Sequence, residues 1–535
     1  MDLGALLTAT LTDTLGVSVP HFRVELAIAA TVVLVLLCRM LPVLRWLDSG
    51  IVALGGAAFA LWYAWVDFRG LAPDAAPVEL FGGLLVADSL TGWIRLLLAA
   101  FLVLYVVFTK ASGIPDREDG ADFYTLVFGA TLGMCLMASA NHLLTVFMAV
   151  EMASVPSYAL AGILKGRKAA SEAALKYAVY GAGAAGIMLY GISLLAGVTG
   201  TCHLPSLARE LAVAAGTPGG PTMALVLGGL MVAAGLAFKL SAVPFHFWCP
   251  DVFEGAAAEV GAFLSVASKA AAVALLLRIG LAVGDPAVAA AGPEAAAGLA
   301  SIRHFIVVLV ALMAAVTCTL GNLAAYGQTN MKRMLAYSTI AHAGYLMMGA
   351  AAAFALQGTQ AGAARDSVAA LAFYLGTYLF MNLAAFAIVA LLRNRLRSEE
   401  IASYAGLVRS SPGIVVATAV VLVSLIGLPP LAGFVAKFLV FSALAQAIRA
   451  GAEQQVMLVL LVAGGLNTVL SLFYYLRVLK VMTFDPPPED RAGEAFPLVS
   501  LPGAIITALA VPVLVLGVFW SGLYDAALRA AGLMS

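Results

Sequence analysis

Runs of about twenty apolar residues follow one another along almost the whole chain, and they constrain the fold more than any other feature. Hydrophobic residues occupy 63% of the 535 positions and charged residues only 11%, more apolar surface than a water-soluble fold could bury. Inside lipid, a spanning segment must satisfy its backbone hydrogen bonds internally, which a helix does. The sequence therefore predicts an all-α polytopic membrane protein.

About fourteen transmembrane helices can be counted on this basis. They lie near residues 24–44, 51–67, 81–109, 122–139, 142–164, 172–198, 222–243, 257–282, 303–324, 329–353, 366–393, 412–447, 455–481 and 500–530. Basic residues concentrate in alternate loops, such as Lys110 after the third span and Lys165 and Lys168 after the fifth. The positive-inside rule places these loops in the cytoplasm and both termini on the outer side.

Two spans contain prolines that should interrupt their helices. The seventh span runs into Pro244, and the twelfth contains Pro429 and Pro430. Proline removes a backbone donor and clashes with the preceding turn, so helices 7 and 12 should be broken. Broken spans at matching places in two halves are typical of transport sites in folds built from repeats.

An internal repeat agrees with this arrangement. The segment SYALAG at 157–162 resembles GYLMMG at 344–349, 187 positions later, and Lys239 and Lys437 are 198 positions apart. Helices 4–8 would then correspond to helices 9–13, and five helices per unit give the two copies opposite topology. The predicted parts are residues 1–121 with helices 1–3, residues 122–283 with the first repeat, residues 303–484 with the second, inverted repeat, and residues 500–535 with helix 14.

The two repeats should differ in their charged residues. Moved forward by 187 positions, Glu151 falls on Ser338. Moved forward by 198 positions, Lys269 falls on Asn467. The second repeat thus has neutral polar residues where the first has an acid and a lysine.

Four ionisable residues lie within apolar spans: Glu151 in the fifth, Lys239 in the seventh, Lys269 in the eighth and Lys437 in the twelfth. A charge at membrane depth costs about 2.5–3.5 kcal/mol on insertion scales, so four such residues indicate a function. A lysine that is costly to keep charged readily gives up its proton. We predict that these four side chains form a proton relay.

Structural roles are the alternatives for the same residues. Glu151 could pair with a cation only for assembly, and Lys239 and Lys437 could cap carbonyls freed at the helix breaks. Capping explains Lys269 poorly, since no proline lies near it in the sequence.

Four further residues are possible members of the relay: Lys176, His246, Tyr337 and His342. Lys176 opens the sixth span, where a lysine can instead extend to the cytoplasmic surface. His246 follows Pro244, where it could face a cytoplasmic opening. A lone histidine in the membrane, such as His342, is more often a satisfied core residue.

The remaining chemistry-bearing residues give no cofactor site. The five cysteines are scattered, without the close pairs that metal or disulfide sites need. The sequence has no phosphate-binding glycine loop, nucleophile elbow or metal-ligand spacing. We therefore expect no cofactor on this chain and no nucleic-acid partner.

Several motifs in the right order identify a family. Residues 235–255 (GLAFKLSAVPFHFWCPDVFEG) closely resemble a signature of the antiporter-like membrane subunits of bacterial NADH:quinone oxidoreductase, respiratory complex I, and of subunit N in particular. The motifs at 172–177 (EAALKY), 332–345 (KRMLAYSTIAHAGY) and 427–433 (GLPPLAG) resemble the same family. The resemblance extends over spans four to thirteen.

The resemblance implies two inverted five-helix bundles and no redox centre on this chain. Glu151 would be the acid that pairs with Lys239, Lys269 the central relay residue, and Lys437 the lysine of the second broken helix. FMN, iron–sulfur clusters and quinone would lie in partner subunits. The partners would be neighbouring antiporter-like and small membrane subunits, in a bacterial inner membrane.

The sequence thus predicts a proton-translocating membrane-arm subunit that couples quinone reduction elsewhere in the complex to proton pumping. One alternative is a subunit of a multisubunit cation/proton antiporter or of a hydrogenase-linked ion pump. A second alternative is a non-conducting module that only anchors its neighbours.

Overall fold

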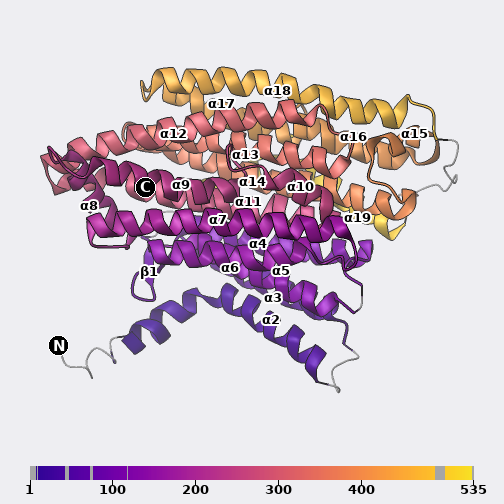
Figure 1. Cartoon of the computed structure of the whole chain (residues 1–535), viewed down its shortest axis with the longest axis horizontal. Coiled ribbons are helices and arrows are strands. Elements are labelled where there is room, and N and C mark those ends of the chain that lie inside the picture. Colours follow the sequence, from indigo (N-terminus) through magenta and orange to yellow (C-terminus); the bar gives the residue numbers. More distant parts are fainter. Residues whose placement is uncertain are drawn as a thin grey trace.

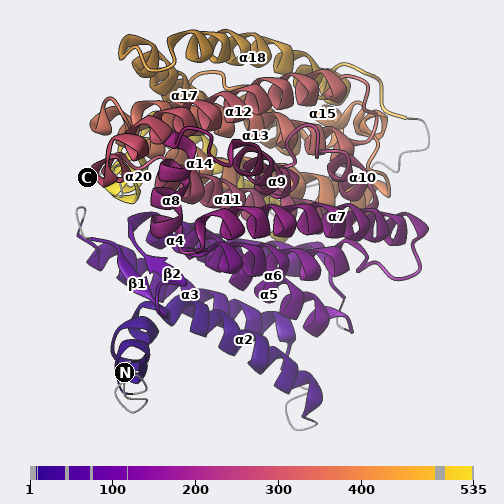
Figure 2. The same ribbon diagram turned by 60° about the vertical axis from the view of Figure 1, so that its left-hand side comes forward.

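In a computed structural model, the chain forms a bundle of helices whose axes run roughly parallel to one another (Figure 1). The structure describes residues 8, 10–41, 47–72, 76–116, 118–488 and 500–532. The chain progresses from the side formed by α2 (Arg23–Met40) and α3 (Ser49–Gly70) to the side formed by α18 (Gln454–Thr483), and its last helix, α20 (Ser521–Ala530), returns to the middle of the bundle (Figures 1 and 2). Within the described residues, 13 helices can span a membrane, or 14 if a pair bent between His21 and Arg23 counts as one span. The all-α polytopic membrane fold is confirmed.

The helices follow the predicted order. The first part of the bundle contains α2 (Arg23–Met40), α3 (Ser49–Gly70), α4 (Ser89–Ser112), α5 (Gly120–Ser139), α6 (Leu143–Ala161), α7 (Lys168–Thr199), α8 (Leu204–Gly216), α9 (Thr222–Leu240), α10 (Trp248–Gly255) and α11 (Ala258–Val283). The second part contains α12 (Pro293–Ala325), α13 (Met331–Leu356), α14 (Ala361–Leu396), α15 (Leu407–Ser410), α16 (Pro412–Ile426), α17 (Ala432–Arg449), α18 (Gln454–Thr483), α19 (Leu501–Val518) and α20 (Ser521–Ala530).

Two predicted spans differ from the observed helices. The span predicted from residue 81 begins only at Ser89, because β1 (Val78–Leu80) and β2 (Leu85–Ala87) form an antiparallel hairpin just before it. The span predicted at 500–530 is divided into α19 and α20. The second piece carries Asp525 and Arg529, polar residues that favour the membrane surface over its interior.

Both spans that were predicted to be broken are interrupted. The seventh consists of α9 and α10, and the helix ends at Ser241, whose φ of 53° is left-handed. The twelfth consists of α16 and α17, and Gly427 follows α16 with a φ of 90°. A left-handed residue ends the run of helical hydrogen bonds, and glycine adopts this conformation without steric cost.

The two five-helix units are joined internally by matching backbone contacts. In the first, the amide of Leu143, which begins α6, donates to the carbonyl of Cys202 at 2.8 Å. In the second, the amide of Met331, which begins α13, donates to the carbonyl of Glu399 at 2.9 Å. The donors are 188 positions apart and the acceptors 197, close to the predicted offsets. This correspondence supports the repeat interpretation.

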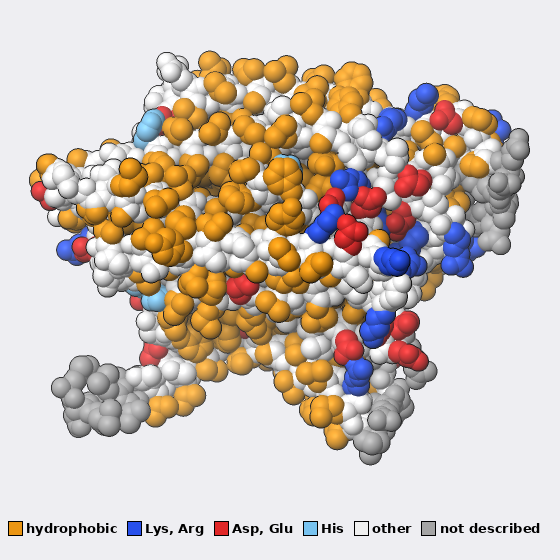
Figure 3. All heavy atoms as spheres, viewed as in Figure 1, with side chains coloured by type: hydrophobic (Ala, Val, Ile, Leu, Met, Phe, Trp, Pro, Cys, Tyr) orange, Lys and Arg blue, Asp and Glu red, His pale blue; other side chains and the backbone are white. Residues whose placement is uncertain are grey.

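The centre of the bundle is formed by α11, α13 and α14, whose apolar stretches are almost wholly buried, whereas α3, α18 and α19 are mostly exposed. Because α11 belongs to the first unit and α13 and α14 to the second, the most buried region is the junction between the units. Figure 3 shows hydrophobic side chains across the middle of one face and charged side chains gathered toward its right-hand end. This distribution suits a protein whose helix ends reach water.

Candidate functional site

The first predicted site residue, Glu151, lies on α6 and is half-buried. The hydroxyl of Ser154, almost one turn later, donates to Glu151 Oε1 at 3.3 Å. Among the described residues, the ion pairs do not include Glu151, so the direct contact expected with Lys239 is not formed.

Lys239 occupies the last turn of α9, and only 2% of its surface is exposed. The helix ends immediately afterwards, where the amide of Ala242 donates back to the carbonyl of Ala237 at 2.8 Å. The last carbonyls of a helix have no partner in the helix itself. The carbonyl of Lys239 is therefore free to accept a hydrogen bond from another element.

Lys269 of α11 supplies that hydrogen bond. Its Nζ donates to the carbonyl of Lys239 at 3.1 Å and to the hydroxyl of Ser241. The same ammonium lies 5.3 Å from the centre of the Trp248 ring, on α10. The capping role that sequence reasoning considered for Lys239 thus belongs to Lys269, because tertiary packing brings α11 beside the broken end of α9. The ammonium of Lys269 thus lies against the backbone of Lys239.

Four buried polar side chains connect α11 to the second unit. Ser265 lies one turn before Lys269, on the same side of α11. Its hydroxyl is 3.1 Å from that of Thr339 on α13 and 3.4 Å from that of Tyr378 on α14. Asn382 of α14 donates to the Tyr378 hydroxyl at 2.6 Å and also contacts Ser265. We call these four residues the junction cluster; they place buried hydroxyl groups between α11 and the second unit.

His342 lies on α13, almost one turn beyond Thr339. It extends the line of buried polar side chains that starts at Lys239 and Lys269, which we call the series. Its Nδ1 is 2.7 Å from the hydroxyl of Tyr374, and its ring centre is 5.2 Å from that of Tyr378. On the other side, the ring of Tyr345 lies 6.0 Å away. The predicted histidine therefore lies between the junction cluster and Tyr345.

Lys437 of α17 ends the series and is 3% exposed. Its Nζ donates to the carbonyl of Ile426, the last residue of α16, at 2.9 Å. The ammonium also lies 4.2 Å from the centre of the Tyr345 ring, a close cation–π contact. Lys437 thus caps the second broken helix while facing the aromatic ring that packs against His342.

The other three candidates lie outside the series. Lys176 forms ion pairs with Glu172 at 2.8 Å and with Asp251 at 2.7 Å. His246 lies in the connection between α9 and α10, and its Nδ1 has no hydrogen-bond partner among the described residues. Tyr337 packs, partly buried, against the hydrophobic core.

Sequence reasoning did not identify the neutral polar residues that link the charged ones. They are Ser265, Thr339, Tyr374, Tyr378 and Asn382. The available signal was their spacing: Ser265 precedes Lys269 by one helical turn, and Tyr378 precedes Asn382 by another. That signal is weak, since single hydroxyl residues are common in membrane helices.

Buried ion pairs of another kind hold the helices together. Arg278 of α11 donates to Asp88 at 2.9 Å and to the carbonyl of Ala138 at 2.8 Å, joining α11 to the ends of α4 and α5. Arg95 of α4 donates to Glu25 of α2 at 2.6 Å. These pairs do not contact the relay candidates and serve the packing.

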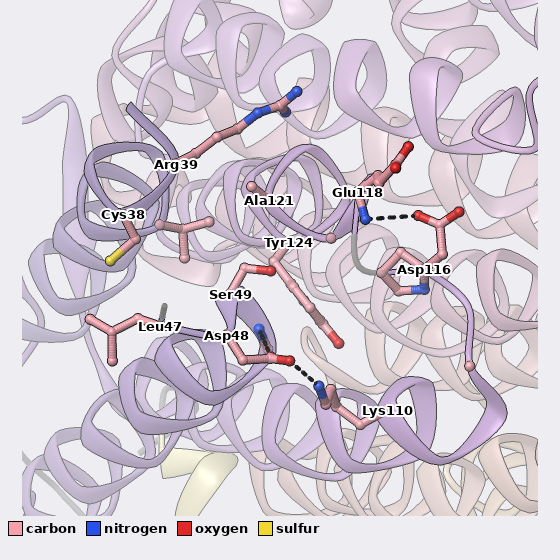
Figure 4. Close-up of a pocket in the computed structure, with 15 residues that line it drawn as sticks. Cys38, Arg39, Leu47, Asp48, Ser49, Lys110, Asp116, Glu118, Ala121 and Tyr124 are labelled. Carbon is pink, nitrogen blue, oxygen red and sulfur yellow. Dashed lines mark hydrogen bonds and ion pairs between the residues drawn. The ribbon is translucent and has the colours of Figure 1, made fainter. Parts of the chain in front are cut away.

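A cavity of about 750 Å³ lies apart from the series, among α2, α3, α4 and α5 (Figure 4). Lys110 and Asp48 form an ion pair at its wall, at 2.6 Å. Partial burial acts to raise the pKa of Asp48, but the hydrogen bond and charge of Lys110 lower it more, so this carboxyl remains ionised. Among the described residues, no group of His, Cys, Asp or Glu side chains could hold a metal ion.

Comparison with known protein sequences gives a consistent result. The family model described as NADH:quinone oxidoreductase/Mrp antiporter, TM, matches residues 140–466. An NADH-quinone oxidoreductase subunit N 2 of Sorangium cellulosum is 40% identical over 528 residues, which cover 97% of this chain and 98% of that protein. A subunit N of Anaeromyxobacter is 39% identical over 514 residues, 94% of each chain.

Solved structures show the same fold. A chain of respiratory complex I from Thermus thermophilus is 33% identical, with a TM-score of 0.70 over 94% of this chain and 98% of that one. A chain of an archaeal membrane-bound sulfane sulfur reductase matches with a TM-score of 0.75 over 96% of each chain. A chain of the Mrp complex of Dietzia matches with a TM-score of 0.72 over 96% of this chain and 97% of that one. At 20% identity, the last two show a shared fold.

Proposed function

Because the chain belongs to the NADH:quinone oxidoreductase/Mrp antiporter family of membrane subunits, we propose that it is a proton-translocating membrane subunit of an NADH:quinone oxidoreductase. The observation that carries this proposal is the buried polar series from Lys239 to Lys437, which joins two broken helices across the junction of the units. The relatives named subunit N support this assignment within the wider family. FMN, iron–sulfur clusters and quinone are expected in partner subunits.

Proton transfer along the series starts at the two adjacent lysines. Lys269, when protonated, donates to the carbonyl of Lys239 and to Ser241, so its ammonium is held beside Lys239. If both lysines are protonated, their like charges repel each other in a low dielectric, which favours the release of one proton. The junction cluster then carries the proton from α11 toward His342, and Lys437 accepts it when its amine is neutral.

Glu151 is the residue through which adjacent subunits would control this proton transfer. A carboxylate at Glu151 would attract an ammonium at Lys239 through space, and a change of about 1.4 kcal/mol in such an attraction alters the proton affinity tenfold. Glu151 is only half-buried on α6, so a rearrangement in an adjacent subunit can reach it. Quinone reduction elsewhere in the complex would thereby release protons through this chain.

The experiment uses sealed inverted membrane vesicles that carry Lys239→Ala, with Lys168→Ala as the control. Lys168 lies at the exposed start of α7 and makes no contact with the series. At matched abundance of the assembled complex, NADH-driven proton uptake should fall about tenfold in Lys239→Ala and remain at the parental rate in Lys168→Ala.

Other outcomes select the alternatives. Unchanged uptake in Lys239→Ala, with normal assembly, would support a chain that only anchors its neighbours. Cation-for-proton exchange that needs no NADH and is lost in Lys239→Ala would support an antiporter subunit, a function that the fold shared with the Mrp complex permits.

A further inference from the structure

A second line of buried polar side chains branches from the series toward α12 and α18 of the second unit. It consists of Asn322 on α12, Ser338 on α13, and Tyr474 and Tyr475 on α18, and we call it the α12–α18 branch. None of the four side chains is more than 2% exposed. The relay described above does not use any of them.

The members of the branch are joined by direct contacts. The hydroxyl of Tyr474 donates to Asn322 Oδ1 at 3.1 Å, and the hydroxyls of Tyr475 and Ser338 are 2.5 Å apart. The two tyrosine rings pack against each other with centres 4.3 Å apart. Asn322 Nδ2 donates to Asn467 at 3.0 Å, which fixes the amide so that its oxygen faces Tyr474. The branch thus consists of two hydrogen-bonded pairs, which are joined by the contact between the two tyrosine rings.

The branch lies between one end of the bundle and its middle. Tyr475 is eight residues from the end of α18 and Ser338 seven residues from the start of α13, or about 11–12 Å from those ends. Half the hydrocarbon thickness is about 15 Å. The basic residues Lys332 and Arg477 assign this end to the cytoplasm. The branch therefore occupies the cytoplasmic half of the membrane.

Arg477 lies where the branch opens toward the cytoplasm. It lies about one turn beyond Tyr474 on α18 and donates to the carbonyl of Tyr326, just after α12, at 2.5 Å. Its buried Nε has no hydrogen-bond partner among the described residues. A buried donor without a protein partner is a place where an ordered water is expected.

The inner end of the branch reaches the second broken helix. Ser338 and His342 are four residues apart on α13, so their side chains are neighbours on one face. From His342, the ring of Tyr345 leads to Lys437. The branch thus connects the cytoplasmic end of α18 with His342 and Lys437 without passing through the lysines of the first unit.

We propose that the α12–α18 branch is a second proton-uptake route, which brings protons from the cytoplasm to His342 and Lys437. The proposal rests on the proton-pumping function proposed above. A proton from cytoplasmic water would be accepted near Tyr474 and passed to the Tyr475 hydroxyl, with water bridging the gaps. Tyr475 would give its own proton to Ser338, and Ser338 would give its proton to Nε2 of His342. Each hydroxyl gains one proton and loses one, so the charge is left on the histidine.

A purely structural role would make a different prediction. Hydroxyl and amide groups across a helix interface can serve only to hold the helices together. In that case, removing a hydroxyl would reduce the amount of assembled complex but not the protons that each complex moves.

The test compares Tyr475→Phe and Ser338→Ala with Tyr404→Phe in inverted vesicles. Tyr404 is a matched control, because it is also buried and its hydroxyl has no hydrogen-bond partner among the described residues. The readouts are protons taken up per NADH oxidised, at matched complex abundance, and the solvent deuterium isotope effect on uptake. We expect both branch variants to lower the ratio about threefold and to raise the isotope effect, and Tyr404→Phe to change neither.

Lys239→Ala, measured in the same set of experiments, distinguishes a failure of the branch proposal from a failure of the proposed function. If Lys239→Ala lowers uptake but both branch variants retain the parental ratio and isotope effect, the branch does not conduct and the proposed function stands. If Lys239→Ala also leaves uptake unchanged, both proposals are overturned.

Discussion

The two five-helix units share their scaffold but differ in how they use charge. Arg278, near the C-terminal end of α11, donates to the carbonyl of Ala138 at the end of α5. Arg477, near the C-terminal end of α18, donates in the same way to the carbonyl of Tyr326 at the end of α12. The corresponding contacts lie at opposite ends of the bundle, as an inverted repeat requires. The helix-joining contacts are thus repeated even where the side chains around them have changed.

The polar groups at the centre of each unit are different. Where the first unit has Glu151 and Lys269, the offsets of the repeat give Ser338 and Asn467 in the second. Ser338 bonds to Tyr475, and Asn467 bonds to Asn322. A carboxylate and an ammonium can store charge, whereas a hydroxyl and an amide can only transmit a proton or hold water. Under the proposed relay, the positions of Glu151 and Lys269 would hold charge in the first unit, whereas the matching positions of the second unit would only conduct protons or hold water.

The largest difference should appear in stability when the matching arginines are removed. Arg278→Ala leaves Asp88 buried without its partner, which should cost about 3–5 kcal/mol. Arg477→Ala removes donors from backbone carbonyls and leaves no carboxylate behind, so it should cost about 1–3 kcal/mol. Thermal unfolding of the detergent-solubilised complex measures both. Equal losses of stability would show that the pairing with Asp88 adds nothing to the shared contact.

A smaller effect is expected at the acid of the first unit. Glu151→Gln keeps the size of the side chain and its contact with Ser154 but removes the charge that acts on Lys239. NADH-driven uptake should fall about tenfold, which corresponds to about 1.4 kcal/mol. Glu151→Asp, which retains the charge, is the control and should keep most of the uptake. Equal rates in the two variants would contradict the electrostatic role of Glu151.

The smallest effect is expected for Lys176, which lies in the first unit but outside the series. Its ion pairs with Glu172 and Asp251 are partly exposed to solvent, which screens the charges, so the pairs contribute little to stability. Lys176→Ala should therefore change neither uptake nor assembly by more than about twofold. A loss of uptake as large as that of Glu151→Gln would place Lys176 in the relay after all.

The membrane spans could be predicted from the sequence because apolar length alone sets them. The hairpin before α4 was missed, since its short apolar strands continue directly into the apolar helix and give no separate signal. The helix breaks after Lys239 and before Lys437 could be predicted from the prolines near them. The prolines could not indicate which side chain caps each break, because Lys269 reaches the end of α9 from a different helix.

The junction cluster could not be predicted for the same reason. Ser265 is 74 residues from Thr339 and 113 from Tyr378, and only the packing of α11 against α13 and α14 brings them together. The charged residues stood out because each is costly in a membrane. Their neutral neighbours carry no comparable cost, so the sequence shows the charges but not the groups between them.

The most direct test of the relay is Lys269→Gln in the purified complex reconstituted into liposomes. Glutamine can still donate hydrogen bonds to the carbonyl of Lys239 and to Ser241, so the capping contacts can survive, but it cannot hold a proton as an ammonium does. Protons moved per NADH should fall about tenfold while the complex remains assembled and oxidises NADH with an artificial acceptor. A parental ratio would show that Lys269 serves only as a cap, and would contradict the relay.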